Sequence, residues 1–467
     1  MKVIWAIALQ ALRLTFRSRI VLVLALLLGA AICLLPATIR SDGTPAGLIH
    51  LHLAYTLGSA SFLLTLATLW AGCAAIAQEA DDKTLQLLLV KPVPRAHVWL
   101  GKWLALLLLN ALLLALAGST SALTLRYKLC HGGFAPEDLA QARATTLTAL
   151  ATTTAPLPDI TAEVEAEYTQ LRARRALPPD APPAVVRDSI RRTRLAQLYS
   201  LAAGATRLWS FPQPPAATRQ LVQFSCDSSI PGAVEIQGTV RLHSGDYTAS
   251  RDFSAMAGTP QTIIFDNVPA ADVITVDVVN RAPTNSTLFF EPAAGLTLRT
   301  PVGAFAGNYL RALALLFLRL ALFAAIGVTL GTLFSLPVAS FLALVLILVL
   351  QLSGFVSSAA QTDRATFVAN VAQFGGGHAH DDSAPPAPSL LARGVANVLY
   401  VTYRGTWYAL RPLLDDHTLD QLATGTHLPP RHVLRALLVQ GLGLPALLAL
   451  IATAVLKTRE WALPNST

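Results

Sequence analysis

Charged residues are scarce in this sequence. Asp, Glu, Lys and Arg make up only 13% of the 467 residues, whereas hydrophobic residues make up 53%. A soluble globular chain carries about 25% charged residues. This deficit excludes a disordered chain and a purely soluble protein of this length, because the polar side chains are too few to cover the apolar surface.

Signatures of catalysis, nucleotide binding and structural zinc are also missing. The chain has no GxxxxGK[ST] loop to hold nucleotide phosphates, and no GxSxG or HExxH motif. Its four cysteines include no CxxC pair. We therefore expect a protein that is not an enzyme and that holds no cofactor of its own. The net charge of +8 is typical of basic cytoplasmic loops in a membrane protein and does not predict a nucleic-acid partner.

Long apolar runs are present instead. Six runs are long enough, at about 20 residues, to cross the hydrocarbon core of a bilayer; they cover residues 20–38, 52–77, 99–124, 305–333, 336–357 and 433–456. Pro337 follows the fourth run, where it breaks a helix and predicts a hairpin. Residues 1–19 predict an amphipathic helix on the membrane lipid; the alternative is that they extend the first span.

Basic residues gather beside alternate ends of these runs. With six spans, the groups before the first run, after the second and after the last share one side of the membrane, which their charge identifies as the cytoplasm. Tryptophan prefers the same boundary and occurs there at Trp5, Trp70, Trp99, Trp103 and Trp461. The expected fold is an α-helical polytopic membrane protein with six spans and both termini in the cytoplasm.

Two segments are expected on the extracytoplasmic side. Residues 126–300 predict an α+β insert that is helical over 134–208 and β-rich over 218–300, where β-branched alternation indicates a β-sandwich-like module. Residues 358–432 predict a loop with interfacial helices. The other parts are spans 1–3 with a cytoplasmic loop, spans 4–5, and span 6 with its tail, within residues 20–125 (loop 78–101), 301–357 and 433–467.

A few polar residues are candidates for chemistry. Cys130 and Cys226 both lie in the expected insert, where an oxidising compartment permits a disulfide, but distance cannot be judged from sequence. His378, His380 and Asp381 carry metal-binding side chains. The alternative for this glycine-rich tract is a solvated loop.

Two arginines lie in the fourth apolar run. Arg311 and Arg319 are eight residues apart in the sequence and therefore lie near one helical face. A charge inside a membrane span marks a functional site by default. We expect Arg311 to extend its side chain to the lipid headgroups instead, while for Arg319 both interpretations stay open.

The loop between the second and third runs has the most informative sequence, QEADDKTLQLLLVKPVPRAHVWLGKWLA. Asp82 predicts the N-cap of a short helix that begins at Lys83 or Thr84. Leu85 and Leu88 then share one face, and Pro92 ends the helix. An apolar face on a cytoplasmic helix is suited to the groove of a partner protein; the alternative is a helix that lies on lipid.

This loop resembles the permease subunits of ABC-2 type exporters, and it is most similar to the subgroup described as multicopper-enzyme maturation or gliding-type permeases. The resemblance is carried by Glu79, Thr84, Leu88, Pro92, Arg95, Gly101 and Lys102, with support from ALRLTFRSR, GTLFSLPVA and LKTREW. It covers the six spans and their inner loops, but the compact family pattern has no insert like residues 126–300.

The resemblance implies a multi-pass subunit in the inner membrane that dimerises with itself or with a sibling permease. A separate ABC ATPase subunit would bind ATP and Mg and would drive the permease through residues 79–95. The residues implied in this coupling contact are Glu79, Asp82, Thr84, Leu85, Leu88, Pro92 and Arg95. One alternative is a membrane-anchored extracytoplasmic binding or scaffold protein without transport activity, and another is a metalloprotein that uses His378 and His380.

Overall fold

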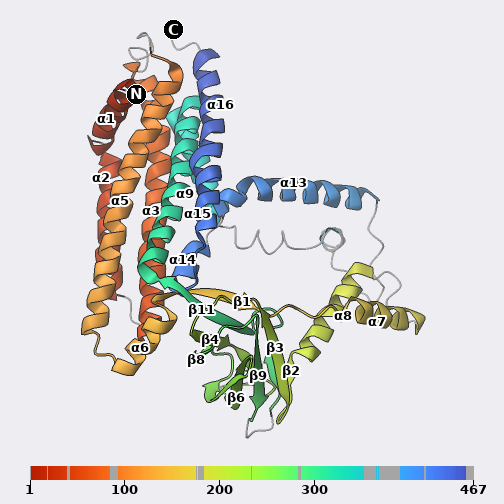
Figure 1. The fold of residues 1–467 in the computed structure, drawn as a ribbon. Coiled ribbons are helices and arrows are strands. Elements are labelled where there is room, and N and C mark those ends of the chain that lie inside the picture. Colours follow the sequence, from red (N-terminus) through yellow and green to blue (C-terminus); the bar gives the residue numbers. More distant parts are fainter. Residues whose placement is uncertain are drawn as a thin grey trace. The chain divides into compact units, whose positions relative to one another are not determined.

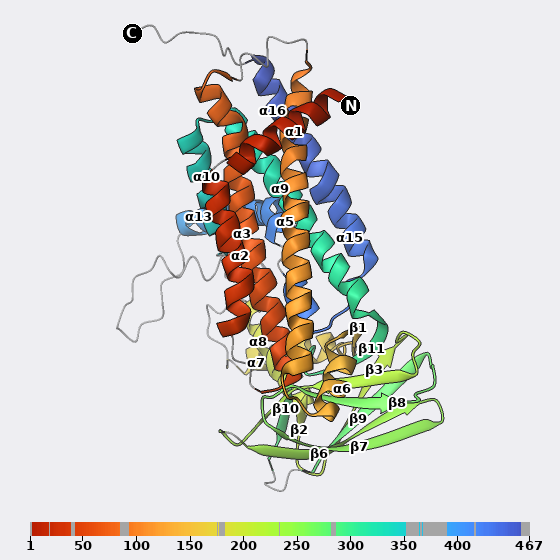
Figure 2. The ribbon, with the colours of Figure 1, turned by 90° about the vertical axis from the view of Figure 1, so that its left-hand side faces the viewer.

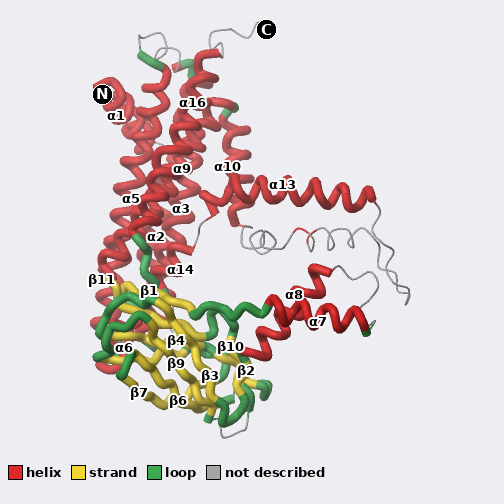
Figure 3. Tube along the Cα trace, turned by 45° about the vertical axis from the view of Figure 1, so that its right-hand side comes forward, coloured by secondary structure: helices red, strands yellow, loops and turns green. Residues whose placement is uncertain are grey.

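The structure is a computed structural model of the whole chain. It describes residues 2–17, 19–38, 43–84, 93–174, 176, 183–232, 234–281, 286–351, 364, 367, 390–414 and 417–458. The chain forms two compact units. Unit 1 comprises Met1–Ala149, Gly303–Gly354 and Leu410–Thr467, and unit 2 comprises Leu150–Val302 and Phe355–Ala409. Figure 3 colours the helices red and the strands yellow; nearly all of the strand residues belong to unit 2, which also contains most of the 25-residue helix Leu390–Leu414.

Unit 1 is a helical bundle (Figure 1). Its helices are α1 (Lys2–Arg17), α2 (Arg19–Thr38), α3 (Pro45–Asp81), α5 (Arg95–His131), α6 (Pro136–Thr145), α9 (Phe305–Leu333), α10 (Leu336–Gln351), α14 (His417–Ala423), α15 (Pro430–Ala436), the π-helix η1 (Leu437–Gly443) and α16 (Leu444–Thr458). Within the described residues, four helices are long and apolar enough to cross a membrane, namely α3, α5, α9 and the continuous Pro430–Thr458. The apolar runs expected there are thus helical. α10 is a shorter apolar helix, and crossing by α2 and α10 remains a prediction.

Hydrogen bonds between the helices of unit 1 give their relative directions. Hydrogen bonds join the end of α3 to the start of α5, and the start of α3 to the end of α5, so the two helices are antiparallel. α9 runs parallel to α3, since its first turns bond to the end of α5. The end of α16 and helix α1 both lie at the end of the bundle where α5 begins (Figure 2).

Glycines bring α3 and α9 into backbone contact. Gly327 and Gly331 have the small-xxx-small spacing that lets membrane helices approach closely. A Cβ atom added to Gly327 would lie 2.9 Å from the Leu69 carbonyl oxygen and 3.1 Å from the Gly72 Cα atom. No side chain fits at this crossing, so the two helices are held at a fixed point nearer to the ends of α3 and α9 than to their starts.

Among the residues that the structure describes, unit 2 contains three sheets, with strand orders β1-β11-β4-β8, β2-β10-β5 and β3-β9-β6-β7. The strands are β1 (Thr148–Thr154), β2 (Ser200–Leu201), β3 (Thr206–Pro212), β4 (Arg219–Phe224), β5 (Cys226–Ser228), β6 (Glu235–Ser244), β7 (Tyr247–Met256), β8 (Gln261–Asp266), β9 (Val273–Asn280), β10 (Leu288–Phe290) and β11 (Leu296–Ala304). The helices α7 (Thr161–Ala173) and α8 (Pro183–Leu198) precede most of them, and α13 (Leu390–Leu414) follows later.

The sheets of unit 2 share one hydrophobic core. Phe224 and Leu298 from one four-stranded sheet, and Phe211 and Val240 from the other, belong to a single buried cluster. Two sheets that bury their inner faces against each other form the layers of a sandwich. The sheet-rich region expected over 218–300 is present, and its long β6–β7 hairpin closes at a turn where Gly245 has a φ of +60°.

The structure differs from the expected helical segment over 134–208. Strands β1 and β2 lie inside this range and β3 begins in it, and α6, α7 and α8 occupy only parts of it. β1 has the sequence TALATTT, in which threonine is β-branched and favours a strand. Its pairing with β11, far along the chain, overrides the weak local helix signal of its alanines.

Candidate functional site

The candidate site lies where α3 ends and α5 begins. The Asp82 N–H donates to the carbonyl oxygens of Ala80 and Gln78, so Asp82 caps the C-terminus of α3. Lys83 follows with a φ of +59°, the left-handed conformation that commonly ends a helix. The Thr84 hydroxyl donates to the Glu79 carbonyl oxygen at 3.2 Å. These contacts therefore end α3 at Asp81–Thr84.

A buried ion pair joins the two helices just inside this turn. The Lys102 ammonium of α5 donates to the Glu79 carboxylate of α3. The side chains of Lys102 and Glu79 are only 4% and 18% exposed. Two buried opposite charges stabilise one relative position of their helices, because moving either one leaves a charge without compensation. The register between the end of α3 and the start of α5 is thus held by charge.

Two further contacts connect the start of α5 with α16 and α1. The Arg95 guanidinium donates to the Leu456 carbonyl oxygen near the end of α16, an acceptor that a helix leaves free in its last turn. On α1, Ile7 packs against Gly101 so closely that an added Cβ there would lie 2.6 Å from the Ile7 Cγ2 atom. α1 therefore packs on the protein through Ile7, Ala8 and Ala11.

Two tryptophans link the same part of α5 to α9. The Trp99 indole N–H donates to the Thr329 hydroxyl at 3.3 Å, and the Trp103 indole N–H donates to the Ala321 carbonyl oxygen at 2.9 Å. Their rings stack with centroids 5.7 Å apart. Trp99 was expected near the membrane boundary, and that position stays a prediction. Its side chain is fully buried among the helices, where its N–H has a partner on the neighbouring helix.

The first two turns of α5 thus contact four other helices, α1, α3, α9 and α16. A force applied to the turn between α3 and α5 would act on a connected assembly rather than on one helix. Rigid-body motion of packed elements is one established way in which a protein transmits a conformational change.

The sequence-predicted coupling residues divide into two groups. Glu79, Asp82, Thr84 and Arg95 lie together at this end of the bundle, although Asp82 caps the end of α3 and not the start of a new helix. Leu85, Leu88 and Pro92 lie outside the described residues. Lys102 was expected to flank the membrane. A lysine directly before the apolar LALLLL run could have indicated a buried partner of opposite charge. That partner is Glu79, 23 residues earlier in the chain.

The other candidate residues do not form a site. Cys130 and Cys226 are both free, so they form no disulfide: the Cys226 thiol is buried in the core of the sheets, while Cys130 is exposed on the last turn of α5. His378, His380 and Asp381 lie outside the described residues, and the described part of the chain contains no group of metal-binding side chains.

Arg311 differs from the expectation that it extends to lipid headgroups. Its Nη1 atom donates to the Leu428 carbonyl oxygen at 2.6 Å and lies 3.2 Å from the His427 Nδ1 atom. Nearby, the buried Asn308 side chain bonds to the carbonyl oxygen of Thr426 and the N–H of Leu428. The side chains of Arg311 and Asn308 therefore form hydrogen bonds with backbone groups of residues 426–428.

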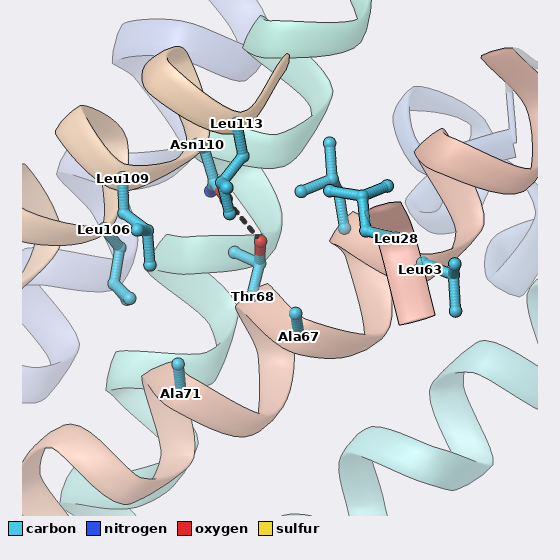
Figure 4. Close-up of a pocket in the computed structure, with 10 residues that line it drawn as sticks. Leu28, Leu63, Ala67, Thr68, Ala71, Leu106, Leu109, Asn110 and Leu113 are labelled. Atoms are coloured by element: carbon cyan, nitrogen blue, oxygen red, sulfur yellow. Dashed lines mark hydrogen bonds between the residues drawn. The ribbon is translucent and has the colours of Figure 1, made fainter. Parts of the chain in front are cut away.

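Figure 4 shows a small gap between α2, α3 and α5, about 10 Å³ in volume. The Thr68 hydroxyl donates to the Asn110 Oδ1 atom across it at 2.9 Å. A cavity needs roughly 10–15 Å³ to hold one water molecule. This gap is therefore a feature of packing and not a ligand site.

The comparison with known families connects this geometry with a class of protein. Residues 5–155 match the family model described as ABC-2 family transporter protein. The match covers α1 from Trp5 onward, α2, α3, α5, α6 and β1, and therefore the whole candidate site except Thr329, Ala321 and Leu456. About a third of the chain lies in the ABC-2 match, and neither a curated protein nor a solved structure matches the chain.

Proposed function

We propose that this chain is the membrane-spanning permease subunit of an ABC-2 type transporter, driven by a separate ABC ATPase. The observation that carries the proposal is the ABC-2 match over residues 5–155, which includes the turn between α3 and α5. No Walker A motif occurs in the sequence, so ATP and Mg would bind to the partner. The proposal includes dimerisation with a second copy or a sibling permease.

The contacts at the end of the bundle support an ATPase docking site there. Residues 79–95 begin and end within the assembly held by the Glu79–Lys102 ion pair and by the Arg95–Leu456 contact. The partner would grip the leucines of the intervening segment, and α5 would carry the motion to the neighbouring helices. The proposed subgroup is the multicopper-enzyme maturation or gliding-type permeases, because their loop pattern resembles this one.

The proposed orientation places this end of the bundle in the cytoplasm of a cell with an inner membrane. Lys2, Lys83, Arg95 and Lys457 all belong to elements at this end, as the preference of basic residues for the cytoplasm requires. α5 ends at His131 and α9 begins at Phe305, both at the other end of the bundle, and the chain passes into unit 2 after Ala149 and out of it at Gly303. Residues 126–300 would thus be extracytoplasmic, which suits an exporter that hands its cargo outward.

Substitution of Leu85 or Leu88 by Asp tests the coupling contact. We expect each variant to lose co-purification with an ATP-binding partner in mild detergent, because a carboxylate in an apolar groove is strongly unfavourable. The matched control is Leu157→Asp, since Leu157 is an exposed leucine of unit 2. An ATPase retained by both loop variants contradicts the coupling assignment.

If isolated unit 2 keeps the full activity without any ATPase, the protein is instead an anchored binding or scaffold protein.

A further inference from the structure

A second cavity of unit 1 has no part in the coupling site. Its volume is about 330 Å³, and it is bounded by α3, α9, α10 and α14. This lies within the range of about 300–1,000 Å³ that ligand pockets occupy. The residues of α3 at the cavity belong to Ala54–Thr65, and Thr65 precedes Glu79 by about 21 Å along the helix axis. The cavity and the coupling site therefore occupy different halves of the bundle.

The cavity contains a permanent positive charge. Arg319 lines it, and the guanidinium lies 5.6 Å from the centre of the Phe323 ring. Arg319 is near the middle of α9, about 21 Å from either end at 1.5 Å per residue. A guanidinium stays protonated in a protein. A charge at that depth is costly in a membrane span and is typically retained for a ligand or a transport path.

The other walls are mostly apolar. Phe62, Ile347, Leu350 and Leu419 contribute hydrocarbon surface. Phe62 is 42% exposed, so one wall of the cavity reaches the surface of the bundle. Such a wall offers a path for an apolar chain from the surrounding membrane.

Besides Arg319, the cavity is lined by a few neutral polar side chains and by one exposed carboxylate. Ser61, Thr65 and Gln351 supply hydrogen-bonding side chains. The Asp420 side chain is 70% exposed and its carboxylate lies 3.7 Å from the His50 imidazole, so its charge is screened by water. Arg319 therefore dominates the electrostatics inside the cavity.

We propose that this cavity binds a lipid anion, with its carboxylate or phosphate group on Arg319 and its hydrocarbon chain along Phe62, Ile347 and Leu350. A guanidinium offers two parallel N–H donors to such a group, and this charge-assisted pair is stronger than a neutral hydrogen bond. Binding itself needs no ATPase. Only the further step, that the bound amphiphile is the exported cargo, rests on the proposed function.

The test uses purified full-length protein in phosphatidylcholine nanodiscs with two radiolabelled probes, palmitate and hexadecanol. They have chains of equal length and differ in the carboxylate. Wild-type protein should bind palmitate saturably and at least about tenfold more tightly than hexadecanol, and Arg319→Gln should remove that preference. Arg319→Lys should keep part of it, because a point charge replaces the bidentate fork.

A steric variant tests the cavity without touching the charge. Gly58 lines the cavity, and an added Cβ there meets nothing within 4 Å, so Gly58→Leu should fill the space and abolish palmitate binding without disturbing the fold. Gly29→Leu is the matched control, since Gly29 also lies in a helix with free space around it, on α2. This pair keeps the proposal testable if Arg319→Gln fails to fold.

Equal binding of the two probes, or binding that survives both Arg319→Gln and Gly58→Leu, overturns the proposal. Competition by short-chain phosphatidylglycerol separates the two sources of the anion: displacement of palmitate identifies a phospholipid headgroup as a ligand, and no displacement identifies a free fatty acid. Co-purification of an ATPase with Gly58→Leu is measured in parallel. If the protein binds palmitate but no ATPase co-purifies, the proposed function alone is contradicted. If an ATPase co-purifies but palmitate does not bind, the lipid site alone is contradicted.

Discussion

At the scale of single residues, the pairing of Lys102 with Glu79 explains why a bundle of apolar helices tolerates charge. Each side chain alone would be a buried ion, and together they hold two antiparallel helices in register. The cost of removing one partner is asymmetric, because Glu79 is more exposed than Lys102. Water can solvate a remaining Glu79 better than a remaining Lys102.

We predict that Glu79→Gln destabilises the protein more than Lys102→Met. Loss of one member of a buried pair costs about 3–5 kcal/mol, whereas replacing both by apolar or neutral groups is close to neutral. The double variant should therefore unfold at a temperature near that of the wild type. Thermal unfolding in detergent, followed by tryptophan fluorescence, measures all four proteins. Equal and additive losses would show that the two charges do not interact.

The residues of the coupling site were only partly predictable from the sequence. Glu79 and Arg95 were predicted through the loop pattern, because that pattern is local. Lys102 and Trp99 were assigned to the membrane boundary, since basic and indole side chains usually lie there. Their actual partners, Glu79 and Thr329, come from other helices, and no periodicity within α5 identifies them.

At the scale of elements, the crossing of α3 and α9 at Gly327 depends on the absence of a side chain. Hydropathy predicted these helices well, because a run of apolar residues longer than 20 has few other structures. It did not predict which pairs cross closely, because small residues are common in every run. The short strand β1 was missed for a related reason: its partner β11 is distant in sequence.

We predict that Gly327→Ala destabilises unit 1 by about 1–3 kcal/mol, the usual cost of overpacking. The added methyl group would lie 2.9 Å from a backbone oxygen of α3, which cannot rotate away. Gly29→Ala is the control, because a Cβ there meets nothing within 4 Å and alanine favours a helix. Unfolding temperatures compare the two variants, and a harmless Gly327→Ala would contradict the close crossing.

At the scale of the whole molecule, two cysteines report on topology. Cys130 and Cys226 differ in burial. Burial raises the pKa of the Cys226 thiol to about 12, with a smaller contribution from the Asp227 charge. The thiolate, which is the reactive form, is therefore scarce at neutral pH. Cys130 is exposed on the last turn of α5, where a reagent in water can reach its thiol.

We predict that a membrane-impermeant maleimide added to intact cells labels Cys130, and that Cys226 reacts only after denaturation. Cys130→Ser should abolish the labelling of intact cells. In a Cys130→Ser background, Lys83→Cys should become labelled only after the membrane is permeabilised, because Lys83 lies at the opposite end of the bundle from Cys130. Labelling of Lys83→Cys in intact cells would reverse the proposed orientation.

The division of the chain into a bundle and a sheet-rich region was predictable from composition, because the apolar runs stop near residue 124 and resume near 305. The ABC-2 match ends at residue 155, just past the boundary between the two units at Ala149 and Leu150. The details of unit 2 were less predictable, since its pairings join strands far apart in the chain. Its three sheets follow from tertiary packing.

The neighbouring positions of β1 and β11 have a consequence for how such a protein can be altered. The chain enters the sheet-rich unit through β1 and leaves it through β11, and these strands are adjacent in one sheet. The positions where the chain enters and leaves this region are therefore close together, as the termini of a domain often are in proteins that tolerate domain insertion. A short linker in place of residues 150–302 would have to join only Ala149 to Gly303, where a Cβ added to Gly303 would lie 3.9 Å from the Ala149 Cβ atom. We therefore expect that other domains can be grafted onto the same bundle at this point.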